Sequence, residues 1–489
     1  MSDQQEIKKN VTQGLKWVTA GQGLNYLFQF VVWAILARLL PPTSFGALSV
    51  AMVFANLAIV FNELGMSSAI VQRKELEPRH LNAPFWICIC IGVLFVLAAV
   101  SASPLIALYF KNQTITALVI IIAGKYFVDS FGIVHEATLK RALAFRKLAI
   151  IDIWSNLVYS TVTLTLVISG FGIVAVGWGY LASSVVRVTQ LWGRSSFRPR
   201  FTIDKEGFLD LFQYGRNILG FKVINYFTGN LDVVLIGKYL GTATLGFYSL
   251  SSLLANFPRQ KLSLIISNIA FPAFSRMQDD LEEVRQGYLK IIRCAAVINF
   301  PILIGLMLLA PQFITLVYSD KWLPIVTPLR ILCVSGICFS LTTFIGTVFE
   351  AVGRPDYSLK YCLISLGGVI IAIFSGKKYG LVGVTSALAV YAVVMNIIGQ
   401  IMVKKVIHLG LRKYLKALVP AVIASLAMAG GIAVLIWVQA NIITLPNLWF
   451  VLQSIVAGAG FYAYSLFIFN RQTYREITEL IHKLTRRGE

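Results

Sequence analysis

The residues that could do chemistry in this chain are polar and charged side chains set inside long apolar runs. Lys222, Asn225 and Asp232 fall at helical positions i, i+3 and i+10, so they share one face of an otherwise apolar helix. An ionisable group at membrane depth costs about 2.5–3.5 kcal/mol on insertion scales, so such groups usually line a water-filled path. A cation in such a cavity suits a phosphate group as a point charge.

A matching polar face occurs near the start of the chain. The dipeptide Asn-Tyr stands at residues 25–26 and again at 225–226, and Gln22, Asn25 and Gln29 mark the equivalent face. Two interpretations stay open: these faces line a shared central pathway, or their amides only hydrogen-bond between helices. Within this helix pair the mid-span charges lie in the second copy, which predicts that the second copy makes the main contact with an anion.

Further charges lie in other apolar runs. Lys125 and Asp129 are four residues apart and face the same side of a helix, where they can neutralise each other. Such a pair is either structural or leaves Lys125 to meet an anionic substrate. Arg330 lies nearer the outer surface. Glu136 and Asp152 lie near cytoplasmic helix ends, where solvent or basic neighbours reach them, so we expect them to be structural.

The composition classifies the chain as a polytopic membrane protein. Hydrophobic residues make up 57% of the 489 residues and charged residues 13%, which excludes an ordinary soluble enzyme. Runs of about 20 apolar residues recur, each long enough to cross a ~30 Å hydrocarbon core, so we expect an all-α integral membrane fold with about fourteen transmembrane helices. The expected spans lie near residues 17–40, 45–64, 83–103, 115–136, 148–168, 172–192, 214–237, 244–266, 290–310, 327–349, 357–375, 380–402, 415–437 and 448–469.

The basic residues indicate how these spans are oriented. The net charge is +21, but Lys and Arg occur in short blocks between apolar runs rather than in one solvated patch. This distribution follows the positive-inside rule and argues against a nucleic-acid partner. Placing the basic blocks in the cytoplasm puts the N-terminus and the C-terminus on the cytoplasmic side.

Matches at similar offsets predict a duplicated unit. Residues 172–176 (GIVAV) resemble residues 380–384 (GLVGV). Six spans in each copy give both copies the same orientation, so the repeat is parallel and the pathway is expected between the halves. The predicted parts are an N-lobe at 1–192, a cytoplasmic linker at 193–212, a C-lobe at 213–403, and a C-terminal helix pair with a cytoplasmic amphipathic tail at 404–489.

Sequence patterns typical of catalysis or of a bound cofactor are missing. Hydrolase, zinc-protease, Walker A and dinucleotide-binding motifs do not occur in the contexts they need. The six cysteines lie in or beside apolar segments without metal-ligand spacing. We therefore expect a protein that is not an enzyme and has no resident cofactor or metal.

Several ordered motifs resemble a known family. They are ARLLPPTSFGALSV, NELGMSSAIVQRKEL, NYFTGNLDVVLIGKYLGTATLGFYSLSSLLANFP, FPAFSRMQDD and VINFPILIGLMLLAPQFITLVYSDKW. Together they resemble the polysaccharide transporter (oligosaccharide flippase) family of the multidrug/oligosaccharidyl-lipid/polysaccharide exporter superfamily, with colanic-acid-type exporters as the nearest likeness. The last two spans match only in general character.

The resemblance implies a fold and a function. Two six-helix lobes would alternate between inward-open and outward-open states in a bacterial inner membrane. The substrate would be an undecaprenyl-pyrophosphate-linked oligosaccharide, flipped from the cytoplasmic to the periplasmic leaflet for exopolysaccharide, capsule or O-antigen synthesis, including lipopolysaccharide. Membrane lipids, and the polymerase and glycosyltransferases of the same pathway, are the expected partners.

The resemblance also implies roles for charged residues. Such flippases use basic residues of the central cavity to hold the pyrophosphate, and the candidates here are Lys125, Lys222 and Arg330. Proton or sodium coupling is expected of the superfamily, with Asp129 or Asp232 as the coupling residue. Neither role follows from residue spacing alone.

Two other functions compete with a flippase. A drug/cation antiporter of the same superfamily predicts an acidic cavity, whereas the charges expected at mid-span are mostly basic. A polytopic glycosyltransferase or polymerase would need a sizeable extracytoplasmic loop with acidic residues. The longest such loop, at about residues 311–326, carries only Asp320 as an acid.

Overall fold

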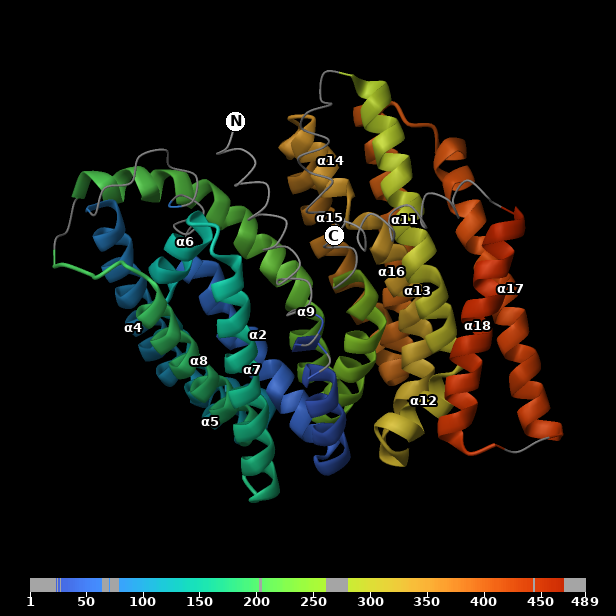
Figure 1. Cartoon of the computed structure of the whole chain (residues 1–489), viewed down its shortest axis with the longest axis horizontal. Helices are drawn as coiled ribbons and strands as arrows, with labels where there is room; N and C mark the ends of the chain where they lie inside the picture. Colours follow the sequence, from blue (N-terminus) through green and yellow to red (C-terminus); the bar gives the residue numbers. More distant parts are fainter. Residues whose placement is uncertain are drawn as a thin grey trace. The chain divides into compact units, whose positions relative to one another are not determined.

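The computed structural model describes residues 23, 25–26, 28–63, 70, 79–201, 205–260, 280–442 and 445–469. Every regular element in these residues is a helix, which confirms the all-α fold (Figure 1). Eight helices there are long and apolar enough to cross a membrane, or nine if a bent pair counts as one span. Val223–Pro258 includes parts of two expected spans, and Pro355–Ile407 includes two whole ones. The predicted amphipathic tail lies outside the described residues.

The chain divides into two compact units, Met1–Gly246 and Phe247–Glu489. In the first unit a helix at Phe28–Leu39 precedes the longer elements. These are α2 (Pro42–Glu63), α4 (Arg79–Phe110), α5 (Thr114–Ser130), α6 (Ile133–Arg141), α7 (Phe145–Ile168), α8 (Val174–Arg194) and the first part of α9 (Lys205–Pro258).

Helix α5 is central to the first unit, because it packs against α2, α4 and α8, while α7 pairs with α8 (Figure 1). The single span expected at 115–136 is broken: α5 ends at Ser130, and α6 begins at Ile133 after a bend of 47°. At the bend, a β-carbon on Gly132 would lie 3.0 Å from the side chain of Leu191 on α8. The bend therefore sits where α8 packs closely on the chain, a tertiary contact that hydropathy does not register.

The segment that follows α8 docks on the first unit. Phe197 is buried, and its ring lies 6.0 Å from Phe85 of α4 and 5.3 Å from His135 of α6, between ring centres. The indole of Trp86 donates a hydrogen bond to the carbonyl of Arg200 (3.1 Å). Helix α9 then begins at Lys205, so the end of the predicted 193–212 linker is helical. The helix begins before the apolar run that hydropathy detects.

Replacing Phe197 with alanine should lower the stability of the first unit. A buried Phe→Ala change typically costs about 3–5 kcal/mol, through lost burial and the cavity left behind. We expect a clear drop in the thermal unfolding midpoint of the purified protein. Phe171→Ala is the matched control, because Phe171 is 55% exposed. A midpoint for Phe197→Ala equal to that of the control would contradict the docking.

In the described residues, the second unit contains the end of α9 and ten further elements. Their bounds are α11 (Leu281–Leu308), α12 (Ala310–Val317), η2 (Asp320–Ile325), α13 (Val326–Thr342), α14 (Ile345–Ala351), α15 (Pro355–Gly376), η3 (Lys377–Tyr379), α16 (Gly380–Ile407), α17 (Leu411–Asn441) and α18 (Asn447–Phe469). The carboxylate of Asp280 caps α11 by accepting from the N–H groups of its first turn. The last two helices, α17 and α18, pair with each other, and α17 packs along α11.

Helix α9 joins the two predicted spans at a glycine. Gly241 has φ 85° and ψ 166°, which breaks the helix there. A positive φ costs glycine little, because glycine has no β-carbon. The break therefore separates the predicted spans 214–237 and 244–266 at a residue suited to it.

The sequence repeat coincides with a reciprocal contact in the first unit. A β-carbon on Gly46 would lie 1.8 Å from the carbonyl oxygen of Thr242, and one on Gly246 would lie 1.8 Å from the carbonyl oxygen of Pro42. Residues 42 and 242, and residues 46 and 246, are equivalent at the repeat offset of 200. The backbones of the two copies therefore approach each other at equivalent positions, glycine of one copy against the carbonyl of the other. Only glycine allows so close an approach.

Candidate functional site

A cavity of about 270 Å³ lies among four helices of the first unit. Its walls come from the helix at Phe28–Leu39 and from α5, α7 and α8. Four lining residues carry charge, and the others provide amides, hydroxyls and aromatic rings. The lining residues are Gln29, Trp33, Lys125, Asp129, Asp152, Ser155, Asn156, Tyr159, Tyr180, Ser183, Ser184 and Arg187.

One pair of charges comes from a single helix face. Lys125 Nζ lies 2.6 Å from Asp129 Oδ2, and both side chains are 21% exposed. Ser184 of α8 donates a hydrogen bond of 2.6 Å to the other oxygen of Asp129. Lys125 Nζ also lies 4.1 Å from the centre of the Tyr126 ring, where a cation is attracted to the ring face. The i, i+4 pair predicted from the sequence is therefore present, and α8 holds its carboxylate.

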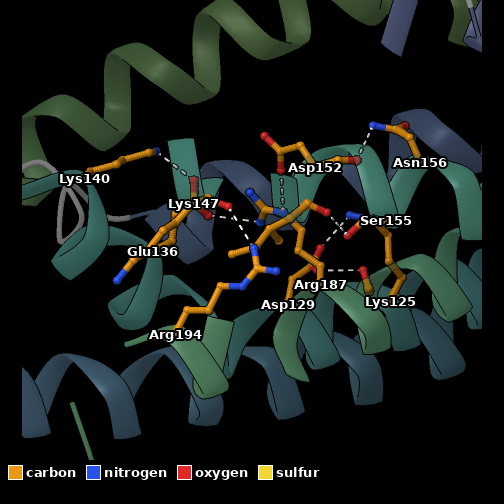
Figure 2. A network of polar contacts seen from close by, with 12 residues as sticks. Lys125, Asp129, Glu136, Lys140, Lys147, Asp152, Ser155, Asn156, Arg187 and Arg194 are labelled. Atoms are coloured by element: carbon orange, nitrogen blue, oxygen red, sulfur yellow. Dashed lines mark hydrogen bonds and ion pairs between the residues drawn. The ribbon is translucent and has the colours of Figure 1, made fainter. Parts of the chain in front are cut away.

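A second group of charges joins three elements (Figure 2). Arg187 of α8 contacts Glu136 of α6 through Nη1 at 3.0 Å and Asp152 of α7 through Nε at 3.3 Å. Lys140 contacts the other oxygen of Glu136 at 2.8 Å. Because each cation has a carboxylate partner, the charges of this network balance. The basic neighbours expected for Glu136 and Asp152 are thereby identified.

The neutral part of the cavity can make hydrogen bonds and ring contacts. Tyr159 and Tyr180 stack with ring centres 4.6 Å apart and planes 26° apart. The amide of Asn156 donates to the carbonyl of Asp152 (2.9 Å). Pockets that combine aromatic walls with a few placed polar groups are typical binding sites for small molecules. The arrangement therefore offers hydrogen-bonding groups, charges and ring faces that suit the binding of a polar ligand.

Comparison with known proteins places the chain in a family. The family described as "Polysaccharide biosynthesis protein" matches residues 35–327, more than half of the chain. The chain belongs to this family. Its relatives include "Lipopolysaccharide biosynthesis protein WzxC" of Escherichia coli, which is 29% identical over 84% of this chain and 85% of the relative. "Teichuronic acid biosynthesis protein TuaB" of Bacillus subtilis is 28% identical over 86% of this chain and 88% of the relative.

A third relative and two solved structures extend the comparison. "Succinoglycan biosynthesis transport protein ExoT" of Rhizobium meliloti is 28% identical over 73% of this chain and 72% of that protein. The structure titled "Lipid II flippase MurJ, inward closed conformation" has a TM-score of 0.71 at 16% identity and covers 92% of this chain and 98% of that chain. A multidrug resistance MATE family transporter of the MOP superfamily has a TM-score of 0.59 at 17% identity, over 78% of this chain and 95% of that chain. The structural matches show a shared fold.

The structure of this polysaccharide biosynthesis family member brings together part of the predicted site. Gln29, Lys125 and Asp129 all line the cavity of the first unit. Asn25 lies one turn before Gln29, and its buried side-chain oxygen has no hydrogen-bond partner among the described residues. A buried unpaired acceptor carries a free-energy cost, so Asn25 is a place where a ligand donor or water would be favourable.

Three of the remaining predicted residues, Asn225, Asp232 and Arg330, are not among the described residues that line this cavity. Asn225 is exposed and Asp232 half-buried, both on α9. Arg330 belongs to the second unit, where its Nε donates to the carbonyl of Met307 at 3.0 Å. Lys222 lies on α9, but its side chain, like the whole of Gln22, falls outside the described residues.

Sequence reasoning missed the importance of Arg187. Arg187 lies seven residues before α8 ends at Arg194, which places it about 10 Å inside the helix at 1.5 Å per residue. An arginine two turns inside an amphipathic helix, with carboxylates on two other helices, was the available signal. Which carboxylates it meets depends on helix packing.

Proposed function

We propose that this member of the polysaccharide biosynthesis family is a flippase. Its substrate would be an undecaprenyl-pyrophosphate-linked oligosaccharide, moved from the cytoplasmic to the periplasmic leaflet of the bacterial inner membrane. The observation that carries the proposal is the cavity among membrane helices, with paired charges and neutral polar groups on its wall. The names of the relatives, a transport protein for succinoglycan among them, support the same function.

The lining of the cavity suits a substrate of this kind. Lys125 and Arg187 provide cations for a phosphate group, and guanidinium binds phosphate in a directional way. The amides, hydroxyls and tyrosine rings provide hydrogen bonds and contact area for sugar residues. A path lined in this way lets a polar head group cross while its lipid tail stays in the bilayer.

The proposal extends to the parts predicted from the sequence. Two lobes with boundaries at 1–192 and 213–403 would alternate in access, with both termini in the cytoplasm. Lys222 and Arg330 would contribute further basic groups, and Asn225 would lie on the same path. Asp129 or Asp232 would couple transport to protons or sodium. The polymerase and glycosyltransferases of the pathway would supply and consume the substrate.

The drug/cation antiporter is the second candidate. It predicts an acidic cavity, whereas the cavity of the first unit is lined by two acids and two bases: Asp129, Asp152, Lys125 and Arg187. The likeness of this chain to a MATE transporter is a likeness of fold. The balanced lining lacks the acidic excess that the antiporter predicts.

Removing the gene from its host and restoring it on a plasmid tests the proposal. We expect the deletion to stop polysaccharide production and to accumulate lipid-linked oligosaccharide on the cytoplasmic leaflet, where an external sugar-modifying enzyme cannot reach it. Restoring the gene should reverse both effects. Normal polysaccharide production with increased sensitivity to cationic drugs would support the antiporter instead.

Lys222→Ala in the restored gene should lower polysaccharide production by about 10-fold or more. A hydrogen bond to a charged group is worth about 1.5–3 kcal/mol, which corresponds to this range. Polysaccharide yield per cell is the measurement, with membrane content of the protein checked by immunoblot. The control is Lys378→Ala, an exposed lysine in the second unit. Equal yields for the two variants would show that Lys222 does not contribute to transport.

A further inference from the structure

A group of basic side chains lies at one end of the first unit, apart from the residues that line the cavity. They come from the junction of α6 and α7 and from the end of α8 with the segment that follows it. These two stretches, residues 137–151 and 188–201, contain no Asp or Glu. Their basic residues are Lys140, Arg141, Arg146, Lys147, Arg194, Arg198 and Arg200.

The two stretches meet in space. Arg194 donates a hydrogen bond from Nη1 to the carbonyl of Lys147 (3.2 Å), and the hydroxyls of Thr138 and Ser195 lie 3.2 Å apart (Figure 2). Helix α7 begins at Phe145 and is long and apolar enough to cross a membrane. The end of such a helix lies at the level of the lipid head groups. The basic side chains are therefore placed at a membrane surface.

The segment that carries Arg198 and Arg200 is held in place at three points. The ring of Phe197 is buried among aromatic side chains. The backbone N–H of Arg200 donates to the side-chain oxygen of Asn82 (2.9 Å), and its carbonyl accepts from the indole of Trp86 (3.1 Å). The positive-inside rule needs only the charge of a basic block, not a fixed backbone. A fixed backbone lowers the cost of ordering these side chains around a ligand.

The held segment presents cations and an apolar ring side by side. The side chains of Arg198 and Arg200 are exposed. Arg198 uses Nη1 to donate to the carbonyls of Ser195 (2.8 Å) and Phe197 (2.7 Å), which leaves its donors on Nε and Nη2 for another acceptor. Phe201 is 79% exposed. Aromatic rings at the ends of membrane helices lie where head groups meet acyl chains.

We propose that this held segment binds the phosphodiester head group of an anionic phospholipid of the bilayer. Arg198 and Arg200 contact its phosphate, because a planar guanidinium matches two phosphate oxygens at once. Phe201 lies against the first part of the acyl chains. A zwitterionic phospholipid binds less well, because the surplus of basic residues repels its ammonium group. The inference does not depend on the proposed flippase function.

A lipid-linked pyrophosphate is the other anionic lipid that could reach this surface. A transported head group must enter the cavity, and none of these basic residues is among the described residues that line it. Arg194 lies seven residues beyond the cavity residue Arg187 on α8, which is about 10 Å along the helix. The position of the surface therefore favours a phospholipid that stays in the bilayer.

Native mass spectrometry of the purified full chain tests the proposal. The protein is released from micelles that contain phosphatidylglycerol or phosphatidylcholine with the same acyl chains, and the number and affinity of bound lipids are measured. The variant combines Arg198→Ala with Arg200→Ala. Its matched control combines Lys404→Ala with Lys405→Ala. This exposed pair at the end of α16 carries the same charge and is expected on the same side of the membrane.

A third variant separates the held backbone from the charge. Trp86→Phe removes the hydrogen bond to the carbonyl of Arg200 but keeps an aromatic ring and every basic side chain. We expect the affinity for phosphatidylglycerol to fall by about 2- to 10-fold, the range of a single hydrogen bond. An unchanged affinity would overturn the proposal that the held segment forms the site.

We expect wild type and the Lys404/Lys405 control to bind phosphatidylglycerol more tightly than phosphatidylcholine. The Arg198/Arg200 variant should lose about 5-fold in affinity for phosphatidylglycerol for each basic side chain removed. Equal binding of the two lipids by wild type overturns the proposal. An equal loss in the two paired variants also overturns it, because it indicates diffuse attraction. Displacement of phosphatidylglycerol by an equal concentration of a short-chain prenyl pyrophosphate would contradict the proposal by assigning the surface to a lipid-linked substrate.

Discussion

Arg187→Ala should abolish polysaccharide export. The change removes the cation that contacts carboxylates of α6 and α7, leaving Glu136 with Lys140 alone and Asp152 without an ion pair among the described residues. Breaking a fully buried ion pair costs about 3–5 kcal/mol, but the Arg187 side chain is 30% exposed, so about 1–3 kcal/mol is the expected loss of stability here. Polysaccharide export should fall by more than the loss of stability explains, because the cavity also loses a phosphate-binding group.

Two measurements on Arg187 variants separate structure from function. The thermal unfolding midpoint reports the packing of α6, α7 and α8, and polysaccharide yield reports transport. The combined variant of Arg187→Ala with Asp152→Asn removes the uncompensated carboxylate, so it should regain most of the stability lost in Arg187→Ala but none of the export. Arg194→Ala is the matched control, because Arg194 lies on the same helix outside the cavity lining. Export restored by the combined variant would show that Arg187 acts only in folding.

Gly46→Ala and Gly246→Ala should each prevent the first unit from folding correctly. The added β-carbon would lie 1.8 Å from a carbonyl oxygen in both cases, and that atom belongs to the backbone, which cannot rotate away. Overpacking usually costs about 1–3 kcal/mol, and a clash with backbone at this distance should lie at or above the top of that range. The two effects should be similar, since the positions are equivalent in the repeat.

The yield of monodisperse protein after extraction measures this effect. Gly430→Ala is the control, because a β-carbon there has no neighbour within 4 Å and residue 430 lies inside α17. Alanine in a helix interior is favoured over glycine by about 0.5–1 kcal/mol, so the control should be at least as stable as wild type. A normal yield of Gly46→Ala would mean that the two backbones do not approach as closely as described.

The sequence predicted features that depend on local spacing. The i, i+4 rule identified the Lys125–Asp129 pair, and hydropathy identified the helices that carry it. The repeat offset of 200 seen for the Asn-Tyr dipeptides also relates Gly46 to Gly246. Each of these follows from periodicity along the chain, which a single sequence contains.

Features that depend on packing between distant segments could not be predicted in this way. Arg187 meets residues 51 and 35 positions earlier, on two other helices, and no local pattern selects those partners. The bend between α5 and α6 and the docking of Phe197 depend on the same kind of contact. Mostly basic charges were expected at mid-span, but the cavity holds equal numbers of acids and bases. The pairing of Arg187 with Asp152 could not be expected, because the two residues lie on separate helices.

The most direct test of the flippase function is a leaflet assay with the purified protein in vesicles. A fluorescent undecaprenyl-pyrophosphate-linked sugar is placed in both leaflets, and a membrane-impermeable quencher is added outside. With wild-type protein the fluorescence should fall toward complete quenching as inner-leaflet lipid reaches the outside, whereas protein-free vesicles and vesicles with Arg187→Ala should keep about half of it. Equal quenching in wild-type and protein-free vesicles, with the protein correctly folded, would contradict the proposed function.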